Sequence, residues 1–254
     1  MKPALKSNPH TTPITPETDN MSTTTSPSKL ADTRSRGLGC LLIIDALLSF
    51  APVAILGSAI GWPASLGKPA AEQMAAIHAA PGAVALGYGL YLLYSVLIAP
   101  VMITLAARSL GGLHKPWAAT VAAFGALSAL ARAIGIVRWL TVMPTLAAAH
   151  AVASPETRTQ LEQIFSAITA YGGGIGEVLG VSLFMALSLG GLCLGAALQG
   201  GLPQWLTVFG GVVALLLAAL AMPAFGLVAT VPVALAVSAL SAWMLALGVW
   251  HLRR

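Results

Sequence analysis

The chain has 254 residues, of which 57% are hydrophobic and only 8% are charged, and its formal net charge is +5. Soluble domains carry about 25% charged residues, so this composition leaves too little polar surface for a water-soluble fold. The Lys and Arg residues are spread over termini and connections instead of gathering on one face, which excludes a nucleic-acid partner. The sequence therefore predicts an integral membrane protein in contact with the lipid bilayer.

Residues 1–36 differ in composition from the rest of the chain. They are rich in Ser, Thr and Pro and contain almost no large apolar side chains. Such a segment cannot bury enough apolar surface to offset the conformational entropy that ordering removes. We expect residues 1–36 to form a disordered cytoplasmic tail and residues 37–254 to form a six-helix transmembrane domain.

Six apolar blocks follow the tail, each near or above the roughly 20 residues that a helix needs to cross a bilayer. They cover residues 38–62, 82–106, 117–146, 173–198, 205–222 and 227–250. The third block is longer than a span requires, so we expect it to tilt or to project. Only residues 223–226 separate the last two, which predicts a tight antiparallel hairpin. The predicted fold class is all-α, a polytopic bundle of six transmembrane helices.

Two connections have a helical pattern of their own. In residues 154–171, Ser154 suits an N-cap and Pro155 suits the first helical position. The apolar residues of this segment recur at helical spacing: Leu161, Ile164, Phe165, Ile168 and Tyr171. We expect an amphipathic helix that lies on the outer membrane face or leads directly into the fourth span. Residues 70–79 predict a shorter helix of the same kind.

The distribution of Lys and Arg predicts the orientation, because cytoplasmic flanks are enriched in positive charge. With the amino terminus inside, the cytoplasmic flanks carry Lys29, Arg34, Arg36, Arg108, Lys115, Arg253 and Arg254, and the opposite side carries only Lys68 and Arg158. We expect both termini to be cytoplasmic.

Four ionisable residues lie within the predicted spans: Asp45, Arg132, Arg138 and Glu177. A charge at mid-helix costs about 2.5–3.5 kcal/mol on insertion scales, so such side chains usually face the bundle interior and pair. Counted at about 1.5 Å per residue, Arg138 and Glu177 lie toward the outer side of the membrane. Arg132 and Asp45 lie nearer the cytoplasm. The sequence predicts contacts within these two pairs, which either only specify helix assembly or line a ligand pocket or ion path.

A glycine ridge is the second feature of the fourth span. Gly172, Gly176 and Gly180 are spaced by four residues, so a neighbouring backbone can approach this bare face closely. We expect these glycines to pack against another helix. A phosphate-binding loop is not expected, because no Lys-Ser or Lys-Thr pair follows and no strand precedes the segment.

No pattern indicates catalysis or metal binding. The histidines form no His-x-x-x-His pair, and Cys40 and Cys193 form neither a zinc motif nor a disulfide framework. A Gly-x-Ser-x-Gly nucleophile elbow is also absent. We therefore expect no catalytic residue, no metal, no cofactor and no enzymatic activity.

Two segments carry a family resemblance. Arg138-Trp139 with Pro144 downstream is followed by Tyr171-x-Gly173 and by Gly176-Glu177-x-x-Gly180. This pattern resembles the bacterial multi-pass membrane proteins of domain-of-unknown-function family 4386, over roughly residues 38–250. The resemblance implies a bacterial cytoplasmic (inner) membrane protein and no assigned activity. It places Arg138 and Glu177 in the same motifs that the charge argument selects.

The sequence favours a non-enzymatic protein that binds or moves a small molecule at the interface of the first, third and fourth spans. This function needs a polar cavity that Arg132, Arg138 and Glu177 reach. The alternative is a structural or regulatory protein that contacts a membrane-protein partner, or a second copy of itself, through the glycine ridge. That role needs a small-residue face exposed to lipid. An enzyme acting on lipids is the third possibility, for which the sequence offers no nucleophile.

Overall fold

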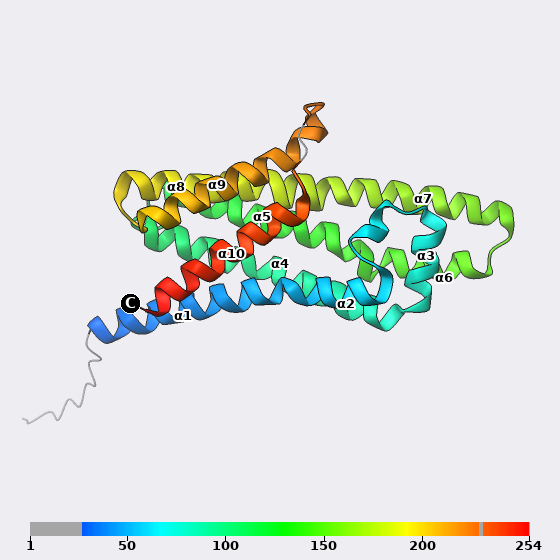
Figure 1. Ribbon diagram of the computed structural model, residues 1–254, viewed down its shortest axis with the longest axis horizontal. Helices are drawn as coiled ribbons and strands as arrows, with labels where there is room; N and C mark the ends of the chain where they lie inside the picture. Colours follow the sequence, from blue (N-terminus) through cyan, green and yellow to red (C-terminus); the bar gives the residue numbers. More distant parts are fainter. Residues whose placement is uncertain (1–26, 229–230, 254) are drawn as a thin grey trace, which may run out of the picture.

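The computed structural model describes residues 27–228 and 231–253, and within these ranges the chain is helical without any β-strand. The elements, in chain order, are α1 (Pro27–Leu48), α2 (Phe50–Ile60), η1 (Ala64–Gly67), α3 (Ala70–Ala79), α4 (Pro81–Ser109), α5 (Pro116–Leu140), α6 (Val142–Val152), α7 (Pro155–Gly173), η2 (Gly174–Phe184), α8 (Met185–Gln199), α9 (Gln204–Ala221), η3 (Met222–Phe225) and α10 (Val233–Leu252). The long helices run lengthwise along one bundle (Figure 1).

Six helical stretches are long and apolar enough to cross a membrane. They are Arg36–Ile60, Pro81–Ser109, Pro116–Val152, Pro155–Gln199, Gln204–Phe225 and Val233–Leu252. Each corresponds to one predicted block, so the predicted bundle of six apolar helices is confirmed. Helix α1 begins at Pro27, so residues 27–36, which composition assigns to the tail, are helical here. The rest of the predicted tail lies outside the described residues.

The amphipathic segment leads directly into the fourth span. Helix α7 continues through the π-helical segment η2 into α8 without a break. The Ser154 hydroxyl accepts a hydrogen bond from the Thr157 N–H at 3.5 Å, as an N-cap should. Phe165 is fully buried, whereas Ile164 and Tyr171 are exposed. The face of α7 that packs against the protein is therefore narrower than the predicted apolar face. A membrane helix can expose its other apolar side chains to lipid.

The predicted start of the sixth span at residue 227 is wrong. Helix α10 begins at Val233, and Gly226 ends the short η3 helix with a φ of 75°. Pro232 therefore precedes α10 instead of kinking it. A proline has no N–H to give to a preceding turn, so it suits this boundary. Hydrophobicity alone did not separate an apolar connection from a helix.

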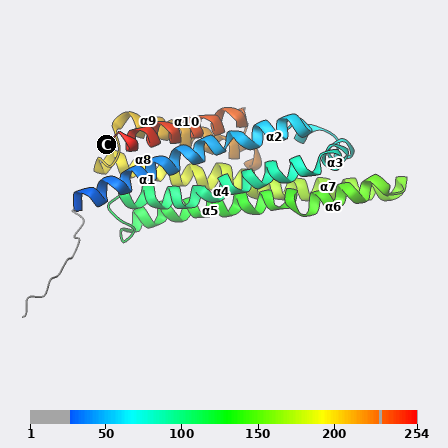
Figure 2. The same cartoon turned by 90° about the horizontal axis from the view of Figure 1, so that it is seen from below.

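The two ends of the bundle differ in what they carry. The start of α1, the C terminus, and the α4–α5 and α8–α9 connections lie at one end, and α3 and the α6–α7 hairpin lie at the other (Figures 1 and 2). The hairpin projects beyond the neighbouring helices, as the length of the third block predicts. His150 Nε2 and Glu162 Oε1 lie 3.0 Å apart, which ties α6 to α7.

Helices α5 and η2 approach each other closely at glycines. A Cβ atom on Gly135 would lie 2.7 Å from the Cα of Gly176, and one on Gly180 would lie 2.8 Å from the backbone nitrogen of Arg132. The Ser128 hydroxyl donates to the Gly180 carbonyl at 2.7 Å. Because the absence of side chains permits this approach, these glycines determine how the α5 side chains lie against η2.

Replacing Gly135 with Ala tests this contact. The added methyl meets backbone atoms that cannot rotate away, so we expect a loss of about 1–3 kcal/mol in the free energy of unfolding. Gly174→Ala in η2 is the matched control, because a Cβ there meets nothing within 4 Å. Equilibrium unfolding in detergent measures both variants. Equal stability of the two variants would refute the close approach.

Candidate functional site

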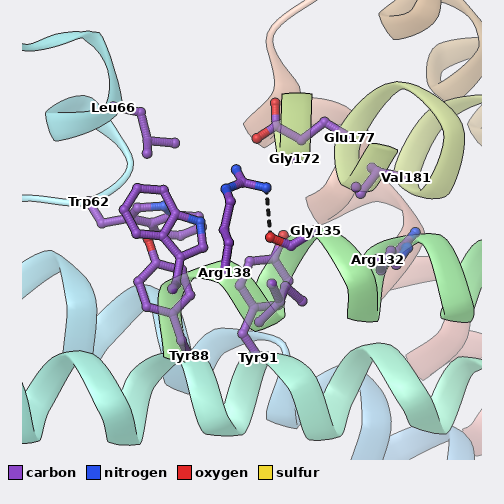
Figure 3. A pocket seen from close by; sticks show the side chains of 13 residues that line it. Trp62, Leu66, Tyr88, Tyr91, Arg132, Gly135, Arg138, Gly172, Glu177 and Val181 are labelled. Atoms are coloured by element: carbon purple, nitrogen blue, oxygen red, sulfur yellow. Dashed lines mark hydrogen bonds between the residues drawn. The ribbon is translucent and has the colours of Figure 1, made fainter. Parts of the chain in front are cut away.

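A cavity of about 40 Å³ lies where the α2–α3 connection meets α4, α5 and η2 (Figure 3). On a scale of about 10–15 Å³ for each molecule, this space holds about three waters. Aromatic rings, charged side chains and glycines make up its lining: Trp62, Leu66, Tyr88, Tyr91, Arg132, Gly135, Ile136, Arg138, Trp139, Gly172, Gly176, Glu177 and Val181. The cavity is therefore polar on one side and aromatic on the other.

Arg138 and Glu177 reach this cavity from different helices. Arg138 projects from α5 and Glu177 from η2, and their charged ends point toward each other (Figure 3). Arg138 Nη1 donates to the Gly135 carbonyl at 2.6 Å, and its guanidinium carbon lies 5.2 Å from the centre of the Trp139 ring. In the part of the chain that the structure describes, no ion pair within 4.0 Å joins Arg138 to Glu177. Arg138 and Glu177, the predicted pair, thus face each other across the cavity without a direct ion pair.

Arg132, from α5, lines the same cavity. Its side chain is 2% exposed, and its Nη1 donates to the Tyr94 hydroxyl at 3.1 Å. Arg132 acts electrostatically on Asp45, which is fully buried on α1. Neither carboxylate oxygen of Asp45 has a hydrogen-bond partner among the described residues. Arg132 therefore lines the cavity and also acts on Asp45, with no direct hydrogen bond between the two side chains.

Several hydrogen-bond donors of the cavity lining are buried and have no partner among the described residues. They are Arg132 Nε and Nη2, Arg138 Nε and the Tyr88 hydroxyl. A buried donor without a partner costs about 1–3 kcal/mol, and native structures rarely leave such groups unpaired. The site can therefore hold a molecule that presents oxygen acceptors.

The aromatic wall was missed by the sequence argument, which considered charges. Tyr88 stacks on Trp139 with ring centres 5.0 Å apart, and Trp62 meets Tyr91 edge-on at 5.9 Å. Tyr88, Tyr91 and Tyr94 are three residues apart within an otherwise apolar block. This spacing puts them on one helix face and could have indicated the wall.

The glycine ridge packs inside the chain. A Cβ on Gly172 would run into the Arg138 side chain, one on Gly176 would lie 3.2 Å from the Cα of Gly135, and one on Gly180 would meet the α5 backbone. All of these contacts are with α5. Helix α5 thus covers the glycine ridge within the chain.

The described ranges, 27–228 and 231–253, contain no group of three or more His, Cys, Asp or Glu side chains that could hold a metal ion. The cavity lining carries one carboxylate, that of Glu177, beside its arginine and tyrosine groups.

A double-mutant cycle tests whether Arg138 and Glu177 stabilise each other. Glu177→Gln and Arg138→Gln each leave one charge without its counter-charge in apolar surroundings, so both should lower the free energy of unfolding. The double variant should recover part of the loss, with a coupling of about 0.5–3 kcal/mol. The Lys68–Glu72 pair, 3.6 Å apart and 59% exposed on both sides, is the control and should couple weakly. Additive effects at Arg138 and Glu177 would contradict the pairing.

Comparison with known proteins gave a family but no characterised relative. No curated protein and no solved structure matches the chain. A family described as a domain of unknown function, DUF4386, matches residues 38–250. The match covers most of the chain, including the charged side chains of the cavity. The chain therefore belongs to the DUF4386 family.

Proposed function

We propose that this protein binds a small molecule bearing a carboxylate in the cavity between α4, α5 and η2, without catalysing a reaction on it. The observation that carries the proposal is the set of buried donors on Arg132, Arg138 and Tyr88 that lack partners among the described residues. A carboxylate presents two acceptor oxygens, and a guanidinium donates to them in a matching fork.

The charge of the lining favours an anion. Two arginines and one glutamate face the cavity, which leaves a balance of +1 among its charged side chains. An anion at Arg138 would neutralise this excess where surrounding helices screen it weakly. Glu177, on the opposite wall, would accept a hydrogen bond from a hydroxyl or amino group of the ligand.

The size of the cavity limits the ligand. A space for about three waters suits a molecule of the size of formate or acetate. The rings of Trp62 and Tyr88 offer apolar contacts to a methyl group. Small monocarboxylates are therefore the class that the site supports best.

Ligand-dependent thermal stability tests the proposal with the full chain in mild detergent. We expect acetate and formate to raise the melting temperature, since a ligand at 100 times its dissociation constant stabilises by about 2.7 kcal/mol. Methylammonium, a cation of similar size, should have no effect.

Two variants separate binding at the site from a general salt effect. Arg138→Gln should lose the stabilisation by acetate, and Lys68→Gln, which removes an exposed charge that is not part of the cavity lining, should keep it. Stabilisation that is equal in both variants, or absent in the wild type, would mean that water alone occupies the cavity.

We also propose that the protein lies in the inner membrane of a bacterium with both termini in the cytoplasm. The support is the distribution of basic residues between the two ends of the bundle. Arg108 and Lys115 flank the α4–α5 connection, at the same end as the C terminus, whereas Lys68 and Arg158 belong to the opposite end. Positive charge is retained on the cytoplasmic side of bacterial membrane proteins.

Cysteine labelling in intact cells tests this orientation. In a Cys40→Ser background, Gln160→Cys in α7 and His114→Cys in the α4–α5 connection place exposed thiols at opposite ends. We expect a membrane-impermeant maleimide to label the thiol at position 160 in intact cells and the one at position 114 only after permeabilisation. The reverse pattern would show that the termini are outside.

A further inference from the structure

Asp45 is a buried acidic residue that does not line the cavity. Its side chain has no exposed surface, and both carboxylate oxygens lack hydrogen-bond partners among the described residues. It lies on α1, outside the cavity lining. Its position therefore needs an explanation separate from ligand contact.

Few groups in this environment stabilise the negative charge of the Asp45 carboxylate. The side chain has no exposed surface, and no N–H or O–H of the described chain donates to it. The guanidinium of Arg132 is the positive charge that acts on it. A buried carboxyl group of this kind either keeps its counter-charge or takes up a proton. What happens to Arg132 therefore decides the state of Asp45.

Arg132 has two possible partners. Its guanidinium attracts the Asp45 carboxylate electrostatically. The same side chain lines the cavity, and its Nε and Nη2 have no hydrogen-bond partner among the described residues. An anion in the cavity would attract the guanidinium and weaken its compensation of Asp45. The anion in the cavity and the Asp45 carboxylate thus compete for Arg132, and this competition couples the two positions.

We propose that Asp45 binds a proton when an anion enters the cavity, with Arg132 as the link between the two events. The inference rests on the proposed function, since it needs an anion in the cavity. The charges balance: Asp45, Arg132, Arg138 and Glu177 sum to zero before binding, the anion adds one negative charge, and the proton from solvent cancels it. The four groups and the bound anion together thereby keep zero net charge, which an apolar surrounding favours.

Other titratable groups around Asp45 do not replace it in this role. Helix α1 packs against α2, α4 and α10. Helix α2 carries no titratable side chain, α10 carries His251 in its last turn, and α4 carries Tyr88, Tyr91 and Tyr94, with Arg108 at its end. Arg132, from α5, is the charged group that acts on Asp45. Among these, Asp45 alone is a carboxyl group that a proton neutralises.

Proton uptake on anion binding tests the inference with the full chain in weakly buffered detergent solution. A pH indicator follows protons while acetate or nitrate is added; nitrate is a planar anion that does not itself titrate near neutral pH. We expect uptake of about one proton for each anion bound wherever Asp45 is ionised in the free protein. Over the same range the dissociation constant should rise about tenfold for each pH unit.

Asp45→Asn should bind acetate and nitrate with an affinity that does not depend on pH, and it should take up no proton. Glu72→Gln, which removes an exposed carboxyl group, is the matched control and should behave as the wild type. If Asp45→Asn does not fold, the wild-type measurement with nitrate still overturns the inference when nitrate binds and no proton is taken up.

The outcomes separate this inference from the proposed function. Anion binding without proton uptake, or proton uptake that persists in Asp45→Asn, overturns the role of Asp45 and leaves the proposed function intact. Absence of both acetate and nitrate binding overturns the proposed function, and the coupling with it.

Discussion

Charge balance inside an apolar bundle is the constraint on which this structure depends. Each ionisable group at mid-membrane costs about 2.5–3.5 kcal/mol on insertion scales unless the protein compensates it. Here two acids and two arginines come from α1, α5 and η2, so no single helix is neutral by itself. The charges therefore compensate one another only when these three elements pack together. The last two spans carry no such charge.

The glycines permit that balance. Arg138 and Glu177 can face one cavity only because α5 and η2 approach at Gly135 and Gly176, where a Cβ on either residue would press on the opposite backbone. Larger residues would move the helices apart and widen the cavity that the two charges share. Close packing and the polar site are thus two consequences of the same small residues.

Sequence reasoning reached the six spans, the N-cap at Ser154 and the four charged residues within the spans, because hydrophobicity and charge are read residue by residue. Of these four residues, Asp45 and Arg132 are buried, Arg138 is half-buried and Glu177 is exposed. It missed the start of α10, since an apolar connection and an apolar helix have the same composition. It also paired the charges by depth alone. Depth does not give the rotation of a helix about its axis, so the sequence could name a shared cavity of Arg132, Arg138 and Glu177 only as a requirement of the binding function. The structure has all three side chains in one cavity lining. The amino-acid composition of η2 does not indicate that it forms a π-helix either.

The π-helical segment explains why a ridge of four-spaced glycines can follow α5 over a long distance. In an α-helix four residues exceed one turn, since a turn holds 3.6 residues, so such a ridge drifts sideways. A turn closed by i→i+5 bonds holds more residues, and four residues then fall short of a full turn. Gly172 lies in α7, whereas Gly176 and Gly180 lie in η2, yet all three face α5. The change of helix type offsets the drift, and Glu177, beside Gly176, stays opposite Arg138.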